Sequence, residues 1–398
     1  MCARRLGAVV TVLLAAVACG QGGGPVPRPG PVPSSPRALP PALTSHQADL
    51  VYGRMTDEQR VGQLFMVGES SAGPGPAAVA TALTTYHVGG VTLYGTGWSS
   101  RDKVRSTIQA LQAMAAPASG GARLYVAGNQ EGGRHGSLQA FYGPGFEDLP
   151  AAVDQGQMAP SSLQYSALAW GQELVAAGVN LDLAPVMDTV PPGADVWNEP
   201  VGELHREFGH DPWTVASHGS AFVRGMEAAG ESVAIKHFPG LGRVGGNTDF
   251  SSNGVTDPLT SAGDGYLQPF EAGWRAGAQM VMVSLATYPR IDPANPAVFS
   301  SALITGLLRG QMRFPGPVIS DDLGDAAAVQ GVAPGDRATR FLRAGGDIVL
   351  TQQPTDIAPM TAAVLALMGR DPAFRVQVAA SVHRVLRAKL MAGLIPPG

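Results

Sequence analysis

Cysteine is scarce in this sequence, because the 398 residues include only Cys2 and Cys19, both near the N-terminus. The rest of the chain has no thiols with which to form disulfides, so a hydrophobic core must supply its stability. Pairs of histidines or cysteines at metal-ligand spacing are also lacking. We therefore expect neither a metal centre nor a cofactor.

Long hydrophobic runs and an excess of one charge are lacking as well. Beyond the N-terminal segment, no apolar run reaches the roughly 18 residues of a membrane-spanning helix. The 27 basic and 31 acidic residues give a formal net charge of -4, with no basic stripe. The sequence therefore gives no sign of a nucleic-acid partner, and we expect a monomer.

The N-terminus has the pattern of an export signal. Arg4 and Arg5 precede an apolar run over residues 6–17 that is too short to span a bilayer, and small residues stand just before Cys19. The pattern predicts a lipoprotein signal peptide over residues 1–18, acylation of Cys19, and attachment to the outer, extracytoplasmic face of a bacterial cell membrane. A plain secretory signal stays open, because Ala16 is a less typical residue than Leu at that position.

The composition divides the chain after this signal. Glycine and proline dominate residues 19–43, which show no apolar periodicity, so we expect a linker there. Residues 44–398 have the composition of a globular domain.

Short apolar runs alternate with helical, alanine-rich stretches through this domain. The runs cover residues 63–68, 88–94, 123–128, 179–185, 232–237, 279–285, 317–321 and 347–351. The helical stretches include residues 57–62, 161–177, 211–229 and 373–392. Continuous apolar strands separated by helices predict an α/β fold, a (β/α)8 barrel of the TIM type with a single catalytic domain. A doubly wound open sheet is the alternative.

Polar residues gather directly after these strands, where a barrel enzyme places its chemistry. Segment 129–134 follows the third run, Asp188 the fourth, Lys236 and His237 the fifth, and Asp321 the seventh. A glycine-rich loop after the fifth run ends in Asp249, so two carboxyl groups could reach one pocket, as a retaining glycosidase requires. The alternative for Lys236 is a structural ion pair with Asp188 or Glu131.

Several ordered motifs resemble glycoside hydrolase family 3, in its single-barrel β-N-acetylhexosaminidase branch, from Met55 to about Leu394. These motifs are residues 55–68, 129–134 (Asn-Gln-Glu-Gly-Gly-Arg), 178–188, 206–209, 236–240 (Lys-His-Phe-Pro-Gly) and 319–323 (Ile-Ser-Asp-Asp-Leu). The resemblance implies a retaining exo-β-glycosidase without a cofactor, acting on terminal β-linked sugars, with peptidoglycan fragments as a possible source.

The resemblance also implies roles for individual residues. Asp321 would be the nucleophile that forms a glycosyl-enzyme, although an aspartate there could instead cap the following helix. Adjacent side chains on a strand point to opposite faces, so we expect Asp322 not to share that role. The residues expected to bind the sugar are Asn129, Glu131, Arg134, Asp188, Arg206, Lys236 and His237.

The sequence departs from the family pattern in the same pocket. Leu241 stands where relatives have the first histidine after the Lys-His-Phe-Pro-Gly motif, and residues 247–249 read Asn-Thr-Asp instead of Asp-Ser-His. Asn129 replaces an aspartate that grips sugar hydroxyls. Our hypothesis is that Asp249 is the acid/base, with a pKa raised by the closed site and by the charge of Asp321, while Asn247 helps to hold the loop.

These departures leave other functions open. The protein could be a catalytically impaired, glycan-binding surface lipoprotein, or could have a β-glucosidase-type specificity. A glycine pattern over residues 240–245 matches the dinucleotide fingerprint, but a polar loop follows it where that fingerprint requires a helix, so we expect no nucleotide.

Overall fold

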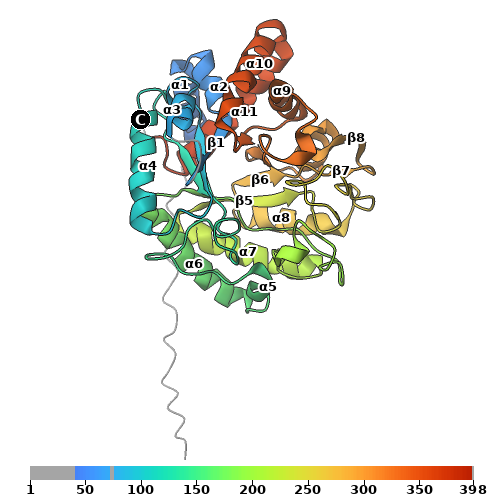
Figure 1. Ribbon diagram of the computed structural model, residues 1–398. Coiled ribbons are helices and arrows are strands. Elements are labelled where there is room, and N and C mark those ends of the chain that lie inside the picture. The colour runs from blue at the N-terminus through green and yellow to red at the C-terminus, as the bar shows by residue number, and fades with distance from the viewer. Residues whose placement is uncertain (1–40, 72–75, 397–398) are drawn as a thin grey trace, which may run out of the picture. The chain divides into compact units, whose positions relative to one another are not determined.

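The computed structural model describes residues 41–71 and 76–396 (Figure 1). The expected signal peptide, Cys19 and the expected linker up to residue 40 lie outside the described residues. Residues 41–43, which we assigned to the linker, lie in the first helix. Among the described residues, no helix combines the length and apolarity needed to cross a membrane.

Eight parallel strands form a nearly closed barrel. They are β1 (Phe65–Ser70), β2 (Gly90–Tyr94), β3 (Tyr125–Gly128), β4 (Leu181–Asp182), β5 (Ser232–Phe238), β6 (Met280–Val283), β9 (Val318–Ser320) and β10 (Val349–Thr351). The hydrogen-bonded order is β10-β1-β2-β3-β4-β5-β6-β9, and a bridge between Ile319 and Ile348 links the two outer members. Each of the eight predicted runs overlaps one of these strands, and the closure confirms the (β/α)8 prediction over an open sheet.

The apolar sequences of the strands reflect their burial in the barrel. All seven residues of β5 are buried, as are all four of β3 and of β6. A strand with one face in the barrel and the other under helices has no solvent-exposed face, so its sequence is continuously apolar rather than alternating. Polar residues appear where the strands end.

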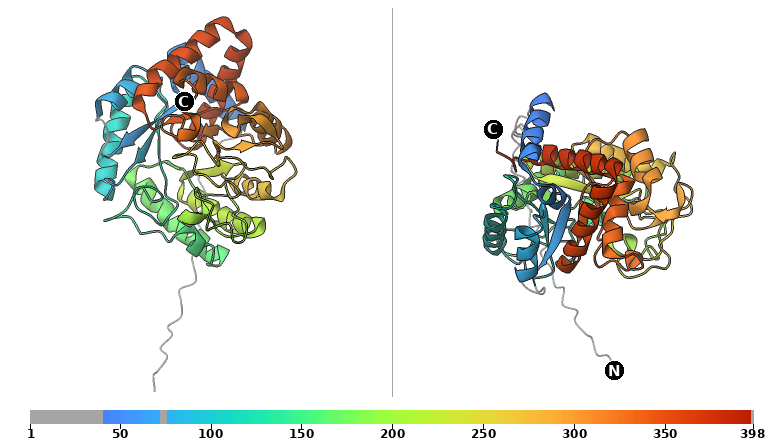
Figure 2. Two further views of the ribbon diagram at one scale, coloured as in Figure 1. Left: turned by 45° about the vertical axis from the view of Figure 1, so that its right-hand side comes forward. Right: turned by 90° about the horizontal axis from the view of Figure 1, so that it is seen from above.

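Helices surround the barrel, as Figures 1 and 2 show. They are α1 (Pro41–Arg54), α2 (Asp57–Gly62), α3 (Pro76–Thr84), α4 (Arg101–Ala115), α5 (Ala152–Gln155), α6 (Pro160–Ala177), α7 (Pro212–Ala229), α8 (Gln268–Arg275), α9 (Pro334–Ala344), α10 (Ile357–Arg370) and α11 (Pro372–Met391). A π-helix spans Ala302–Gln311, and the hairpin of β7 (Thr287–Tyr288) and β8 (Asp292–Pro296) lies outside the barrel sheet. All four helices named from the sequence are present, with ends displaced by at most one residue.

Helix ends show why these boundaries hold. Thr56 and Gln59 form a reciprocal capping box at the start of α2, a feature that stabilises a helix by about 1 kcal/mol. Asp371 caps α11 by accepting from the Phe374 backbone.

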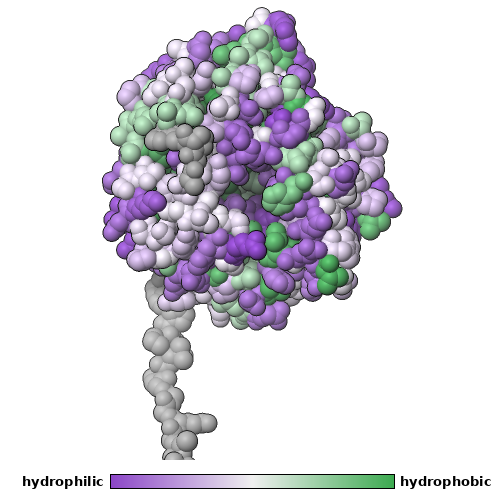
Figure 3. All heavy atoms as spheres, in the orientation of Figure 1, coloured by the Kyte–Doolittle hydropathy of each residue, from purple (hydrophilic) through white to green (hydrophobic). Residues whose placement is uncertain are grey.

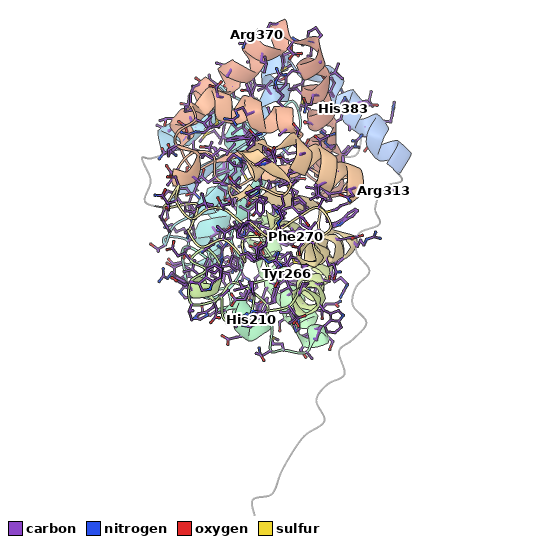
Figure 4. All side chains as sticks on the ribbon, turned by 90° about the vertical axis from the view of Figure 1, so that its right-hand side faces the viewer. His210, Tyr266, Phe270, Arg313, Arg370 and His383 are labelled. Atoms are coloured by element: carbon purple, nitrogen blue, oxygen red, sulfur yellow. The ribbon has the colours of Figure 1, made fainter. Side chains whose placement is uncertain are left out.

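The first and last helices of the described chain are in contact. His383 of α11 contacts Asp49 of α1 at 3.2 Å, and Figure 4 shows His383 beside that first helix.

The order of the elements identifies the face that carries the strand ends. In Figure 1 the helices run counterclockwise from α2 through α4, α6 and α7 to α9. With right-handed β-α-β crossovers, this sense of rotation turns the carboxyl ends of the strands toward the viewer. Active sites of TIM barrels lie on that face.

Candidate active site

A cavity of about 480 Å³ lies at the carboxyl ends of the strands. The space-filling view in Figure 3 shows a hollow in this face, bordered by hydrophilic side chains with apolar ones beside it. Of the residues selected from the sequence, the cavity is lined by Asn129, Arg206, Lys236, His237, Asp249 and Asp321. Glu131, Arg134 and Asp188 do not line it.

Asp321 follows β9 directly, and its backbone amide donates to the Val283 carbonyl of β6 at 3.0 Å. One carboxylate oxygen accepts from the Asp322 backbone at 2.9 Å. Strand pairing therefore fixes the base of this side chain while its carboxyl group borders the cavity. A carboxylate held in this way is suited to act as a nucleophile.

Asp322 supplies the loop-capping function that we weighed for its neighbour. It also touches the cavity, but its oxygens accept from the backbone amides of Gly324, Asp325 and Gln352 at 2.8, 3.2 and 2.9 Å. Burial raises the pKa of Asp322 to about 6, even though these amides favour the charged form. The carboxyl group of Asp322 is thus occupied in tying the end of β9 to the end of β10, which leaves Asp321 free to meet a substrate.

The loop after β5 carries Asp249 to the same cavity. The Asn247 side chain accepts from the Asp249 amide at 3.0 Å, as expected for a residue that holds the loop. The carbonyls of Asp249 and Thr248 accept from the amides of Ala327 and Ala328, both at 3.1 Å. The loop that carries Asp249 is therefore bonded to the segment that follows Asp321.

The start of this loop packs closely against its neighbours. A Cβ on Gly242 would lie 1.9 Å from the Thr189 carbonyl oxygen, so only glycine fits there. Arg243 pairs with Asp264 at 2.7 Å and stacks over the ring of Tyr266, which Figure 4 labels. These contacts fix the position of the start of the loop.

The environment of Asp249 suits an acid. Its pKa is raised, first because the surrounding protein partly desolvates the carboxyl group and second because the charge of Asp321 repels another negative charge. The positive charges of Arg206 and Lys236 oppose this shift. Asp249 is still exposed in the mouth of the cavity, so the group can exchange its proton with solvent.

Buried Glu131 organises two of the cations in the cavity. It holds Arg206 through two hydrogen bonds, of 2.8 and 2.9 Å, and pairs with Lys236 at 2.6 Å. Burial alone would raise the pKa of Glu131, but the two positive charges hold it at about 2. Lys236 therefore forms the ion pair that we considered as an alternative, with Glu131, and it also borders the cavity.

Asp188 has a similar role beneath His237. Its two oxygens accept from the His237 backbone at 3.1 Å and from the ring Nδ1 at 2.7 Å, and it also accepts from the Leu241 amide. Arg206 can only donate, and it lies 3.3 Å from His237 Nε2, so that nitrogen accepts and Nδ1 carries the hydrogen. Asp188 thus positions the ring of His237 from outside the cavity.

The two remaining predicted residues differ in position. The side-chain oxygen of Asn129 accepts from Lys236 Nζ at 3.0 Å, so this asparagine both borders the cavity and orients the lysine. Arg134 is exposed away from the cavity lining, and its carbonyl accepts from the amides of Leu138 and Gln139.

The sequence analysis did not identify several residues of this site. Glu199 accepts from the Asn247 amide at 3.0 Å and thereby links the loops after β4 and β5. Tyr94, Phe250 and Asp325 also border the cavity. Glu199 lies in an irregular segment, so no periodic pattern in the sequence marks it. Phe250 could have been found, because it is an aromatic residue in a polar stretch directly after Asp249.

Among the described residues, no group of three or more histidine, cysteine, aspartate or glutamate side chains is placed to hold a metal ion.

Comparisons with known proteins agree with this geometry. The N-terminal domain of glycosyl hydrolase family 3 matches residues 56–388. A curated protein named β-hexosaminidase from Stenotrophomonas maltophilia is 35% identical over 302 residues, which cover 71% of this chain and 84% of that protein.

Solved structures give the same result. A β-N-acetylhexosaminidase from Beutenbergia cavernae is 48% identical, with a TM-score of 0.81 over 84% of this chain and 98% of that one. A family 3 β-N-acetylglucosaminidase from a Paenibacillus species is 27% identical, with a TM-score of 0.73 over 85% of this chain and 63% of that one. The chain therefore belongs to glycoside hydrolase family 3 and is a glycoside hydrolase.

Proposed function

We propose that the protein is a retaining exo-β-N-acetylglucosaminidase in which Asp321 is the nucleophile and Asp249 the acid/base. The observation that carries this proposal is that the two carboxyl groups, from loops after different strands, border one cavity and interact electrostatically. The specificity is suggested by the similar proteins, which are named for hexosaminidase or N-acetylglucosaminidase activity.

In the first step, a carboxylate oxygen of Asp321 attacks the anomeric carbon as the bond from that carbon to the glycosidic oxygen breaks. Asp249 donates its proton to that oxygen, and the aglycone leaves as an alcohol. The raised pKa of Asp249 keeps a larger fraction of this group protonated near neutral pH than an ordinary aspartate would have.

In the second step, Asp249 is deprotonated and removes a proton from water. The water oxygen attacks the anomeric carbon, the ester to Asp321 breaks, and both carboxyl groups return to their starting states. While Asp321 is esterified it carries no charge, so its repulsion of Asp249 is absent and the pKa of Asp249 falls. This change suits its role as a base in the second step.

Arg206, Lys236 and His237 provide the sugar-binding wall in this proposal. Their heads border the cavity, while Glu131 and Asp188 fix them from behind. Because these side chains are held in place before the sugar binds, little reorganisation is needed when they contact it.

The function can be tested by measuring the release of nitrophenol from aryl glycosides by a protein that comprises residues 42–398. We expect turnover of the β-N-acetylglucosaminide, less or none of the β-glucoside and β-xyloside, and near-complete loss in Asp321→Ala. Turnover of the β-glucoside alone would establish the alternative specificity. A folded protein silent across the panel would favour a glycan-binding role and contradict the proposal.

We further propose that the protein is exported and anchored through Cys19, and that it acts on peptidoglycan fragments outside the membrane. The N-terminal pattern of two arginines, a short apolar run and small residues before Cys19 supports this location. In bacterial cells producing the full chain, the wild type should partition with membranes and Cys19→Ala should not. Equal partitioning of both would contradict the lipid anchor.

A further inference from the structure

Phe250 is the most exposed large apolar side chain among the described residues, with 84% of its surface accessible. It follows the proposed acid/base directly in sequence and borders the same cavity. A single exposed aromatic side chain is ordinary on a protein surface, but one that borders a polar cavity can contact a ligand bound there.

The backbone beneath this ring is fixed. The amides of Phe250 and Ser251 both donate to the Asn247 carbonyl, at 3.1 and 2.9 Å. Asn247 is in turn held by Glu199, and the Asp249 carbonyl accepts from Ala327. The ring is therefore presented on an anchored turn, so a ligand that stacks on it does not have to order the loop.

The chemistry of the site defines which part of a substrate lies there. The acid must lie within hydrogen-bond distance of the glycosidic oxygen, and the aglycone is attached to that same oxygen. A group next to Asp249 on the side open to solvent is therefore adjacent to the aglycone. Phe250 meets this condition because it is the next residue and is exposed.

We propose that Phe250 is an aglycone platform, on which the sugar that follows the cleaved bond stacks. This inference rests on the proposed function and deepens it, because it predicts a preference for saccharide leaving groups. An aromatic face is electron-rich and attracts the C–H groups on one face of a sugar ring. Polar residues at the cavity, including Ser137 and Gln352, can meet the hydroxyls at the ring's edge.

The test compares two substrates with the same terminal sugar. One is the β-1,4-linked disaccharide of N-acetylglucosamine, and the other is N-acetyl-β-glucosaminyl fluoride, whose leaving group has no ring. In Phe250→Ala we expect the ratio of kcat/KM for the disaccharide to kcat/KM for the fluoride to fall roughly three- to tenfold, as expected for loss of one aromatic contact. Phe250→Trp should keep the ratio near the wild-type value.

Trp213 provides a matched control. It is 76% exposed at the start of α7 and does not border the cavity, so Trp213→Ala should leave the ratio unchanged. An unchanged ratio in Phe250→Ala, whether both rates fall equally or neither falls, would overturn the platform while leaving the proposed function intact. A wild-type enzyme that hydrolyses neither compound would instead overturn the proposed function and the platform with it.

Discussion

At the scale of single residues, Asp249 determines how the proposed reaction depends on the leaving group. Asp249→Ala removes the proton donor, so we expect kcat/KM to fall about 10²- to 10⁴-fold for alkyl glycosides and saccharides, which need protonation. Dinitrophenyl glycosides, whose leaving group is a weak base, should lose much less in the glycosylation step. Steady-state kinetics over a series of leaving-group pKa values measures this difference.

The pH dependence of kcat/KM provides a second test of the role of Asp249. A general acid works while protonated, so a raised pKa of Asp249 moves the alkaline limb of kcat/KM above the range of an ordinary aspartate. This limb should disappear in Asp249→Ala with the dinitrophenyl substrate. Persistence of the same limb in the variant would assign it to another group.

Glu131 is a residue whose loss should affect stability and activity together. Glu131→Gln leaves Lys236 and Arg206 buried without their counter-charge, and we expect a loss of about 3–5 kcal/mol in unfolding free energy. The pKa of Glu131 is held at about 2, below its unfolded value, so its contribution is present above about pH 4.3 and is lost as pH falls toward 2.

Denaturant unfolding at several pH values checks this expectation. The difference between wild type and Glu131→Gln should be largest near neutral pH and should shrink below about pH 4. A difference that stays constant between pH 7 and 2.5 would show that the charge of Glu131 is not responsible.

At the scale of elements, the segment between β9 and α9 supports Asp321, the proposed nucleophile. Buried Arg337 of α9 donates to the carbonyls of Leu323, Gly324 and Val332, at 2.7, 3.1 and 2.6 Å. Its guanidinium thus acts as a clamp on the residues that follow Asp321. Gln330 supports the same loop by donating to the carbonyls of Gly324 and Ala326, at 2.6 and 3.2 Å.

Arg337→Met should therefore destabilise the protein by about 3 kcal/mol, because it removes a buried charged donor and leaves several carbonyls without it. It should also lower kcat, since the nucleophile is less well positioned. Arg343→Met in the same helix removes an exposed pair with Asp371 and a cation–π contact with Phe374, and it should cost about 1 kcal/mol. Equal melting temperatures for the two variants would contradict the clamp.

The elements were predictable from the sequence to different degrees. The strands were found because burial on both faces makes a run such as 232–237 continuously apolar, a local property. The π-helix over residues 302–311 could not be distinguished from an ordinary helix, since its hydrogen-bond spacing has no periodic signature.

The site was likewise predicted only in part. Asp321 was found because it directly follows β9, and Lys236 because it lies near the carboxyl end of β5. The sequence could offer the Lys236–Glu131 pair only as one of two alternatives, because these residues are 105 positions apart and meet only once the barrel closes. Arg134 fits its motif, yet it is exposed and does not line the cavity, which a motif match in sequence cannot reveal.

At the scale of the whole molecule, buried carboxyl groups should shape the pH dependence of stability. Glu231 precedes β5 and is 1% exposed, and within the described part of the chain neither of its carboxylate oxygens has a hydrogen-bond partner. Burial, with the nearby charges of Asp182 and Glu227, raises the pKa of Glu231 well above its ordinary value. Burial also raises the pKa of Asp182 and of Glu227 to about 7.

A carboxyl group with a raised folded pKa destabilises the protein as pH rises above its unfolded pKa of about 4.3. We therefore expect Glu231→Gln to match the wild type near pH 4 and to become progressively more stable than it toward pH 8. Thermal unfolding across this range measures the effect, and exposed Glu203→Gln is the control. A constant offset across the range would mean that Glu231 does not titrate in this way.

The hydrogen bonds from Ala327 and Ala328 to the carbonyls of Asp249 and Thr248 have an evolutionary consequence. They use only main-chain atoms, so they set where residue 249 stands without specifying which side chain it bears. If the proposed roles hold, one substitution can exchange the proton-transferring group at this position, while the main-chain contacts keep the new side chain at the same cavity as Asp321. The main chain of residue 249 thus fixes its position, whereas its side chain alone determines the chemistry that it can perform.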